Sequence, residues 1–548
     1  MTRVPTSRFR FTTGHVLGAV LLGGVFVYLA GYPLWYTDIW AHAKYGEWYW
    51  QHAAMPGVEP LSPFSDHEAA FADVAWLSQV VYDGLYEMGA GIAGGDAASR
   101  LRGGAEALRS FHLLLLIARL TLLWLALRRF GGSSAWAIVG LTLYVLAVGF
   151  GSAVQRPQAF GLFLVVLVIY ALSSPALSRR AAIGLPMAFC LWANLHGTFV
   201  VGLAVLGLHT LGRAIERGTA DREVRRLAIV GMACFLATFV NPHGPFVYEQ
   251  VIAFSGHPNL KTMTEWQPMQ LSAGGGNHWP YLMSLVLLAF VRILGGRKIG
   301  VAGLLVALPF AVWPWFQVRS LLWWWSVCVW LLARVGPGLG ERFPTMPAFP
   351  DGEPSRAKAW MTLGIVAASS LAFPPLKLAL LGIPRDLDHT VSAGTPWRLA
   401  LELTAVPADE GRWLPVLRKE LRGRYPNDQF SGAVFASETQ GDFLIWSLPA
   451  DIPVLMYTHA HVFTSAHWQD CMAVRRGDSE ERNGPTGWAA FLGRNRVNLI
   501  IVETGTHAEL TAILRNDKEW QVVWEEPPFE EMPGVRTDKF IALRVSPR

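Results

Sequence analysis

An aspartate and a histidine four residues apart have the types and the spacing that suit acid–base chemistry. Asp38 and His42 lie in the segment Y-T-D-I-W-A-H. Residues i and i+4 of a helix share one face, so a helix from Asp38 to Gln51 would point both side chains into one cavity. A carboxylate in such a place can take the proton of a hydroxyl group as a general base. Asp38 and His42 are therefore the candidate catalytic residues.

Further polar side chains gather where long apolar runs end. Ionisable residues at membrane depth are costly, and this makes them candidates for function. Guanidinium groups in particular bind phosphate oxygens through charge-assisted hydrogen bonds. The candidate substrate-binding residues are Gln155, Arg156, Asn194, His196, His243, Glu265 and Arg319.

Structural roles for the same residues stay open. An aspartate at a helix start can cap the helix, and arginines at helix ends can extend to the membrane surface. Asn194 and His243 lie in N-L-H-G and N-P-H-G, which are typical of turns. No HExxH or comparable ligand spacing occurs, so no metal ligand and no cofactor is assigned. A divalent metal ion is compatible with these residue types.

The elements that must position these residues are transmembrane helices. Hydrophobic residues make up 52% of the 548 residues and charged residues 16%, against about 25% charged in a typical soluble domain. Apolar runs recur from Gly14 to Leu381, and they predict about eleven transmembrane helices at about 20 residues each. This composition excludes an ordinary soluble enzyme, and the excess of Lys and Arg indicates topology rather than nucleic-acid binding.

The basic residues indicate which way the helices run. With the N-terminus in the cytoplasm, most Lys and Arg fall in the inside loops, as the positive-inside rule requires. All candidate site residues then lie at the outer ends of helices. Arg119, in the middle of the second apolar run, is an exception among the polar residues. We expect a multi-pass membrane protein whose C-terminal part is extracytoplasmic.

Two parts of the chain differ in character. Residues 1–381 form the predicted transmembrane domain, with a long first outer loop at 36–105 that holds two helices, Asp38–Gln51 and Val74–Met88. Residues 382–548 alternate strand-like and helical patterns, which favours an α/β domain with a partly parallel sheet. The expected strands are Ala433–Ala436, Pro453–Tyr457, Val497–Val502, Gln521–Trp524 and Phe540–Val545. No Gly-rich phosphate-binding motif follows any of them.

An ordered series of short motifs resembles a large group of bacterial polytopic membrane proteins. The segment D-I-W-A-H-A-K-Y-G-E-W begins at Asp38. It is followed by A-W-L-S-Q, Q-R-P-Q, L-W-A-N-L-H-G, N-P-H-G, E-W-Q-P and G-D-F-L-I-W-S-L-P. The sequence differs from the group at Ala41, where tryptophan is frequent, and at Ala75, where glutamate is frequent.

That group resembles the GT-C glycosyltransferases, which include protein mannosyltransferases and oligosaccharyltransferase catalytic subunits. The resemblance implies a GT-C-like fold in a bacterial plasma membrane. It also implies a catalytic acidic residue at the start of the first outer loop, and Asp38 matches that position. A second acidic motif in a later loop, found in several such enzymes, is not evident in this sequence.

The resemblance implies a function, and two other functions compete with it. The implied reaction moves a sugar from a polyprenyl-phosphate-linked donor to an extracytoplasmic acceptor, which is a glycan, a lipid or a protein. Membrane lipid is a further expected partner of the protein. The first alternative is a transporter or flippase for a lipid-linked or small polar substrate, which Arg119 favours. The second is a non-enzymatic membrane scaffold, which requires that the outer polar residues do not converge.

Overall fold

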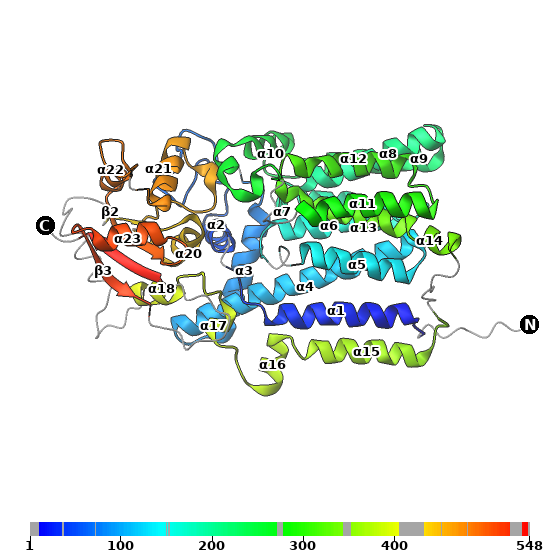
Figure 1. The fold of residues 1–548 in the computed structure, drawn as a ribbon, viewed down its shortest axis with the longest axis horizontal. Coiled ribbons are helices and arrows are strands. Elements are labelled where there is room, and N and C mark those ends of the chain that lie inside the picture. The colour runs from blue at the N-terminus through cyan, green and yellow to red at the C-terminus, as the bar shows by residue number, and fades with distance from the viewer. Residues whose placement is uncertain are drawn as a thin grey trace, which may run out of the picture. The chain divides into compact units, whose positions relative to one another are not determined.

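The fold is mostly helical and includes helices long and apolar enough to cross a membrane, as a computed structural model shows (Figure 1). The structure describes residues 10–35, 38–71, 73–149, 151, 154–270, 278–343, 352–404, 432–450, 452–478, 480–526 and 540–545. Its contacts divide the chain into two compact units. Unit 1 comprises Met1–Tyr32, Arg109–Ile252 and Lys261–Arg385. Unit 2 comprises Pro33–Leu108, Ala253–Leu260 and Asp386–Arg548.

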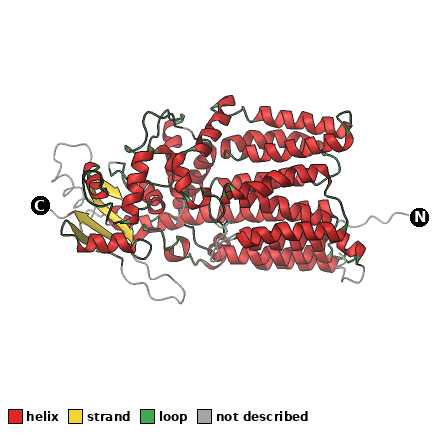
Figure 2. Cartoon of the chain, turned by 45° about the horizontal axis from the view of Figure 1, so that its top comes forward, coloured by secondary structure: helices red, strands yellow, loops and turns green. Residues whose placement is uncertain are grey.

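Unit 1 is a bundle of helices that run side by side over most of their length (Figures 1 and 2). Its α-helices are α1 (Thr13–Gly31), the later part of α4 (Ala97–Gly131), α5 (Ser134–Val148), α6 (Gln158–Leu172), α7 (Arg179–Leu195), α8 (Phe199–Arg217), α9 (Arg222–Ala237), the start of α10 (Val247–Gly256), α11 (His278–Gly295), α12 (Gly300–Val312), α13 (Leu321–Val335), α14 (Pro337–Arg342), α15 (Arg356–Ser370) and α16 (Pro374–Leu381). Its short 3-10 helices are η1 (Gly244–Phe246), the end of η2 (Pro258–Thr262), η3 (Thr264–Trp266), η4 (Trp313–Trp315) and η5 (Val318–Ser320).

The core of unit 1 forms around α13, in which two buried tryptophans have hydrogen-bonded indole N–H groups. Trp330 donates its indole N–H to Ser173 at 3.0 Å, and Trp324 donates to Ser284 at 2.8 Å. Helix pairs that pack closely are α1 with α15, α8 with α12, α7 with α9 and α5 with α13. These contacts position the loops at both ends of the bundle.

Each apolar run expected to cross the membrane is helical, but the expected number of spans is not confirmed. Among the described residues, five helical segments are long and apolar enough: Thr13–Gly31, Ala97–Gly131, Phe199–Arg217, His278–Gly295 and Val318–Arg342. A sixth arises if α15 and α16, which meet at an 80° bend, form one broken span. Helices such as α5 and α6, with 15 residues each, rise only about 22 Å, less than the roughly 30 Å of a bilayer core.

Unit 2 joins the first long loop to the C-terminal part of the chain. Its helices are α2 (Ile39–His52), α3 (Trp76–Ala93), the first turns of α4, the end of α10, α17 (Leu387–Thr390), α18 (Trp397–Thr404), α20 (Glu438–Ser447), η6 (Ala460–Val462), α21 (Ser465–Arg476), α22 (Trp488–Arg494) and α23 (Ala508–Asn516). Buried Glu59 links the two segments, since its carboxylate accepts hydrogen bonds from Tyr45 at 2.8 Å and Tyr457 at 3.0 Å. The predicted division into domains at residue 381 stays a prediction.

A four-stranded sheet completes unit 2. Its order is β1 (Ala433–Phe435), β2 (Val497–Glu503), β4 (Phe540–Val545) and β3 (Trp520–Glu525). β1 runs parallel to β2, whereas β4 is antiparallel to both β2 and β3, so the sheet is partly parallel. The expected strand Pro453–Tyr457 is wrong, because this segment contributes only an isolated bridge between Val454 and Val434.

Candidate functional site

Asp38 and His42 lie at the start of α2, as their spacing predicts. Asp38 occupies the N-cap position, yet its side chain makes no capping hydrogen bond. Its Oδ2 lies 3.8 Å from Nε2 of His42, and the two side chains are 21% and 10% exposed. That separation is longer than a hydrogen bond. Asp38 is therefore not explained as a helix cap, and its partly accessible carboxylate faces the imidazole.

Gln79 of α3 contacts one of the two ring nitrogens of His42. Its amide nitrogen lies 3.1 Å from Nδ1 of His42, and both side chains are buried. An amide N–H can only donate, so Nδ1 accepts and a neutral ring carries its proton on Nε2, facing Asp38. Gly46 makes this approach possible, because a Cβ there would lie 2.1 Å from the carbonyl oxygen of Gln79.

A second histidine packs against the first from the C-terminal part of unit 2. The ring centroids of His42 and His459 are 4.6 Å apart in an edge-on arrangement. Burial lowers the pKa of His459 well below its usual value, and the neighbouring His42 and His461 lower it further. Asn259 holds this segment in place, since its side chain donates to the carbonyl oxygens of Ala460 at 2.8 Å and Phe463 at 2.9 Å. His459 is thus a neutral ring packed against His42.

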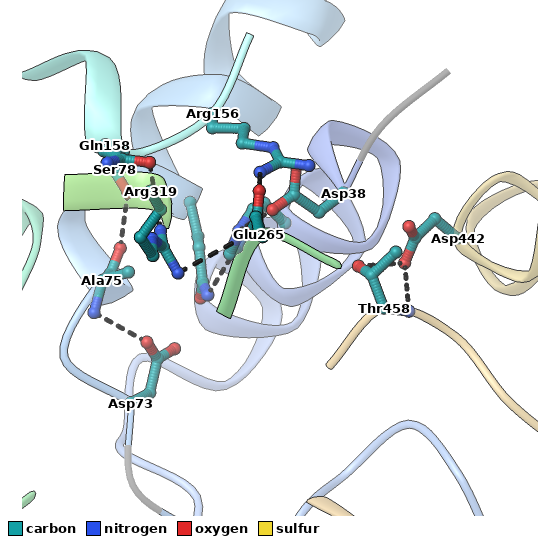
Figure 3. A network of polar contacts seen from close by, with 12 residues as sticks. Asp38, Asp73, Ala75, Ser78, Arg156, Gln158, Glu265, Arg319, Asp442 and Thr458 are labelled. Carbon is teal, nitrogen blue, oxygen red and sulfur yellow. Dashed lines mark hydrogen bonds and ion pairs between the residues drawn. The ribbon is translucent and has the colours of Figure 1, made fainter. Parts of the chain in front are cut away.

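A buried second carboxyl, Asp442 on α20, is coupled electrostatically to Asp38. Its Oδ1 accepts hydrogen bonds from the backbone N–H of Thr458 at 3.1 Å and from the Thr458 hydroxyl at 3.0 Å (Figure 3). Its Oδ2 is buried without a hydrogen-bond partner among the described residues. Burial raises the pKa of Asp442 well above its usual value, and the charge of Asp38 raises it further. The carboxyl of Asp442 is therefore held toward its protonated form.

Aromatic packing fixes α2 against α20. Trp40 is fully buried, and its ring centroid lies 4.9 Å from that of Phe443 and 4.6 Å from that of Trp446. Gly441 allows the close approach of the next segment, because a Cβ there would lie 2.0 Å from the carbonyl oxygen of Met456. The same two motifs that contain Asp38 and Asp442 therefore also contain the aromatic residues that pack α2 against α20.

Three candidate residues of unit 1 come together around one carboxylate. Glu265 accepts a hydrogen bond from Arg156 at 2.7 Å, and a guanidinium nitrogen of Arg319 lies 3.6 Å from its other oxygen (Figure 3). Arg319 also donates to Gln158 at 3.0 Å, and its guanidinium lies 4.4 Å above the ring of Trp266. Two positive charges share one negative charge, so the cluster has a net charge of about +1.

The other candidates of unit 1 make contacts at the ends of α7 and α9. Asn194 donates to the carbonyl oxygens of Cys190 at 2.8 Å and Val240 at 2.7 Å. His196 ends α7 and its Nδ1 lies 3.0 Å from the Thr198 hydroxyl.

Two further candidates of unit 1 lie in the loops beside these helix ends. The backbone N–H of His243 donates to the side chain of Asn241 at 2.9 Å, and Gln155 is 1% exposed. Their contacts suit the positioning of loops, and binding roles for Asn194, His196, His243 and Gln155 stay predictions.

The structure thus forms two clusters from the sequence-predicted residues. Unit 2 holds Asp38 and His42, and unit 1 holds Arg156, Glu265 and Arg319. The expectation that both clusters line one site stays a prediction. Within the described ranges, no group of three or more His, Cys, Asp or Glu side chains is arranged to hold a metal ion. No metal ligands are therefore assigned.

Sequence reasoning missed three residues of the Asp38 cluster: Gln79, Asp442 and His459. Gln79 ends the motif A-W-L-S-Q, and Asp442 lies in G-D-F-L-I-W-S-L-P. Both motifs belong to the ordered series that resembles the bacterial membrane proteins, but nothing in their spacing connects them to His42 or Asp38. His459 stands in T-H-A-H, which has no distinctive pattern.

Comparisons with known proteins find similarity in structure only. No family model and no curated protein matches the sequence. The oligosaccharyltransferase of Archaeoglobus fulgidus in its apo form has a TM-score of 0.56 and 10% identity, over 91% of this chain and 71% of that chain. Archaeal AglB from the same organism, in complex with an inhibitory peptide and a dolichol-phosphate, has a TM-score of 0.56 and 10% identity, over 96% and 75%. The chain therefore has a GT-C-like fold.

Proposed function

We propose that this protein is a membrane glycosyltransferase that moves a sugar from a polyprenyl-phosphate-linked donor to an extracytoplasmic acceptor. The observation that carries the proposal is the Asp38 carboxylate, which does not cap α2 and faces Nε2 of His42 at 3.8 Å. The GT-C-like fold supports the same reaction class. The A. fulgidus neighbour was solved with a peptide and a dolichol-phosphate, and this favours a lipid-linked donor here.

Asp38 acts as the general base in this proposal. The acceptor hydroxyl oxygen attacks the anomeric carbon of the donor, and Asp38 takes the hydroxyl proton as the new C–O bond forms. The bond from the anomeric carbon to the phosphate oxygen breaks, and polyprenyl phosphate leaves with the bonding electrons. His42 turns its Nε2–H toward the Asp38 carboxylate at 3.8 Å, and Gln79 keeps the proton on Nε2 by donating to Nδ1.

The paired carboxyls Asp38 and Asp442 divide their roles. Asp442 is the buried member, and its raised pKa keeps it protonated, so Asp38 carries the negative charge that a base needs. The proton of Asp442 resides on Oδ2, because Oδ1 accepts both hydrogen bonds from Thr458. Asp442 is a positioning residue in this account, and it is a candidate for the second acidic group that the motif pattern does not reveal.

Arg156 and Arg319 stabilise the charge that develops on the leaving phosphate. Oriented guanidinium groups act most strongly where charge appears in the transition state. Glu265 holds both guanidinium groups and leaves a net positive charge for the phosphate. His196, His243 and Asn194 are supporting polar groups, and the acceptor is a glycan, lipid or protein. The protein works in a bacterial plasma membrane with its N-terminus in the cytoplasm and its C-terminal part outside.

A transporter or flippase is the competing function. Its main support in the sequence is Arg119 in the middle of α4, and the structure gives that residue a 3% exposed side chain with its guanidinium 5.7 Å from the ring centroid of Tyr144. The ring of Tyr144 is a structural partner for this arginine, although the Nε of Arg119 has no hydrogen-bond partner among the described residues. The convergence of Arg156, Glu265 and Arg319 counts against a scaffold without a binding site.

The direct test is sugar transfer by the purified full chain in lipid vesicles. A panel of polyprenyl-phosphate pentoses and hexoses is supplied with membrane lipids and glycans as acceptors, and free polyprenyl phosphate is measured. We expect release that requires both donor and acceptor and is lost in Asp38→Asn. The matched control is Glu87→Gln, which alters an exposed carboxylate of α3 that pairs with Arg100. Movement of intact donor across the vesicle without release of polyprenyl phosphate would support a flippase instead.

A further inference from the structure

A basic cavity lies where α4 ends and α5 begins, in unit 1. Its volume is about 460 Å³, and Arg128, Arg129, Ser133, Ser134, Tyr170 and Leu125 line it. Gly132 adopts a left-handed φ of +70° directly after α4, and its N–H donates to the carbonyl oxygen of Arg128 at 2.9 Å. This turn sets the last residues of α4 beside the first residues of α5.

Both arginines are held by aromatic rings. The guanidinium of Arg128 lies 4.8 Å from the ring centroid of Trp124, and its nitrogen lies 3.0 Å from Nε2 of His15. The guanidinium of Arg129 lies 5.1 Å from the ring centroid of Tyr170. Because the Tyr170 ring contacts the face of the Arg129 guanidinium, the N–H groups in the guanidinium plane can still donate to oxygen atoms. Arg129 forms no ion pair within the part of the chain that the structure describes.

The start of α5 adds donors to the same cavity. Ser133 caps the helix by accepting from the N–H of Trp136 at 3.4 Å, but other N–H groups in the first turn have no carbonyl partner within a helix. Ser134 is 5% exposed, and its hydroxyl oxygen has no hydrogen-bond partner in the part of the chain that the structure describes. The dipole of α4 places about half a negative charge at its C-terminal end. The two guanidinium charges and the positive end of the α5 dipole exceed it, so the cavity is positively charged overall.

We propose that this cavity binds the phosphate group of an anionic membrane lipid. Leu125 favours a lipid over a free phosphate ion. It lies four residues before Arg129, on the same face of α4 and one turn farther into the membrane-spanning helix, and its side chain is 37% exposed. An acyl chain can pack on Leu125 while the headgroup phosphate meets Arg128 and Arg129. Basic pockets between transmembrane helices recognise lipid headgroups through this combination.

The site is distinct from the Arg156–Glu265–Arg319 cluster and does not depend on the proposed transfer reaction. Under the topology expected from the loop charges, it lies at the cytoplasmic end of the bundle. Its ligand is therefore a lipid of the inner leaflet rather than a donor or a product of the reaction. Bound lipid would hold α4 and α5 together at this end.

The experiment is native mass spectrometry of the full chain in detergent, titrated with phosphatidylglycerol and separately with phosphatidylcholine. We expect the anionic lipid to bind at least about fivefold more tightly, and Arg129→Gln to remove about fivefold in affinity, which corresponds to about 1 kcal/mol per arginine. Arg129→Lys keeps most of the binding. The matched control, Arg180→Gln, removes an exposed arginine at the start of α7 and leaves binding unchanged.

Three outcomes would overturn the lipid site. They are equal binding of the two lipids by the unaltered protein, unchanged binding by an Arg129→Gln variant that keeps its unfolding temperature, and full displacement of the lipid by millimolar inorganic phosphate. The last result would mean that the cavity recognises a free phosphate ion without the lipid part.

Discussion

Gln79 donates its amide N–H to Nδ1 of His42 at 3.1 Å and so leaves the proton of the neutral imidazole on Nε2, toward Asp38. Both partners are buried and come from different helices, α3 and α2. The packing of α2 against α3 therefore sets the orientation of the His42 side chain. Such a group is preorganised and loses little freedom when a substrate binds.

Replacing Gln79 with methionine should weaken both the fold and the reaction. The change leaves Nδ1 of His42 buried without a donor, which costs about 1–3 kcal/mol in the free energy of unfolding. We expect kcat to fall at least about tenfold while the KM for the donor changes little, because the carboxylate loses its oriented neighbour. Thermal unfolding in detergent and steady-state transfer rates measure the two effects. Gln51→Met is the control, because Gln51 is an exposed residue of α2.

The stability of unit 2 should decrease in mild acid because of His459. Its pKa is lowered by burial in the folded protein, while an unfolded histidine titrates near 6.5. The unfolded state therefore binds more protons below about pH 6.5, and the free energy of unfolding falls as the pH decreases. The contribution of His459 has a slope of at most about 1.4 kcal/mol per pH unit.

His459→Phe keeps a ring in place and removes this titration. We expect a shallower decrease in unfolding temperature between about pH 6.5 and 4 than in the unaltered protein. Asp442 contributes the opposite slope because its pKa is raised, so the difference between the two proteins isolates His459. Parallel curves would contradict the assignment. His52→Phe, an exposed residue of α2, should leave the curve unchanged.

Arg156→Gln and Arg319→Gln should each lower kcat/KM for the donor. Each substitution removes a charged hydrogen-bond donor to the leaving phosphate, which is worth about 1.5–3 kcal/mol and corresponds to about tenfold or more in kcat/KM. Stability should change by less than about 1 kcal/mol, since the ion pairs with Glu265 are partly exposed. Donor titrations at low and high salt measure the loss. Arg213→Gln, which breaks the ion pair with Glu216, is the matched control.

The sequence predicts the parts of the site that depend on local geometry. The i and i+4 spacing of Asp38 and His42 is enough to place them on one face, because the periodicity of a helix is independent of its surroundings. The apolar runs likewise predict the helices of unit 1. The positions of the polar residues at the ends of these helices predict that they lie in the same region. The sequence does not show that Glu265 contacts two arginines.

The contacts that sequence reasoning misses join distant segments. His42 and Gln79 are 37 residues apart, and Asp442 reaches the neighbourhood of Asp38 only because α20 packs on Trp40 through Phe443 and Trp446. No periodicity encodes such a pairing. The glycines that permit these approaches, Gly46 and Gly441, stand inside the motifs, but their meaning becomes clear only from the backbone atoms that they face.

The central claim is that Asp38 takes the proton of the acceptor hydroxyl. Its most direct test is the kcat of Asp38→Asn in a transfer assay with saturating donor, with donor binding measured in parallel. The asparagine fills the same volume and cannot accept the proton as a carboxylate does, so we predict a kcat lower by about 10²–10⁴-fold with donor affinity within about threefold of the unaltered protein. A kcat within about threefold of the unaltered protein would contradict the account.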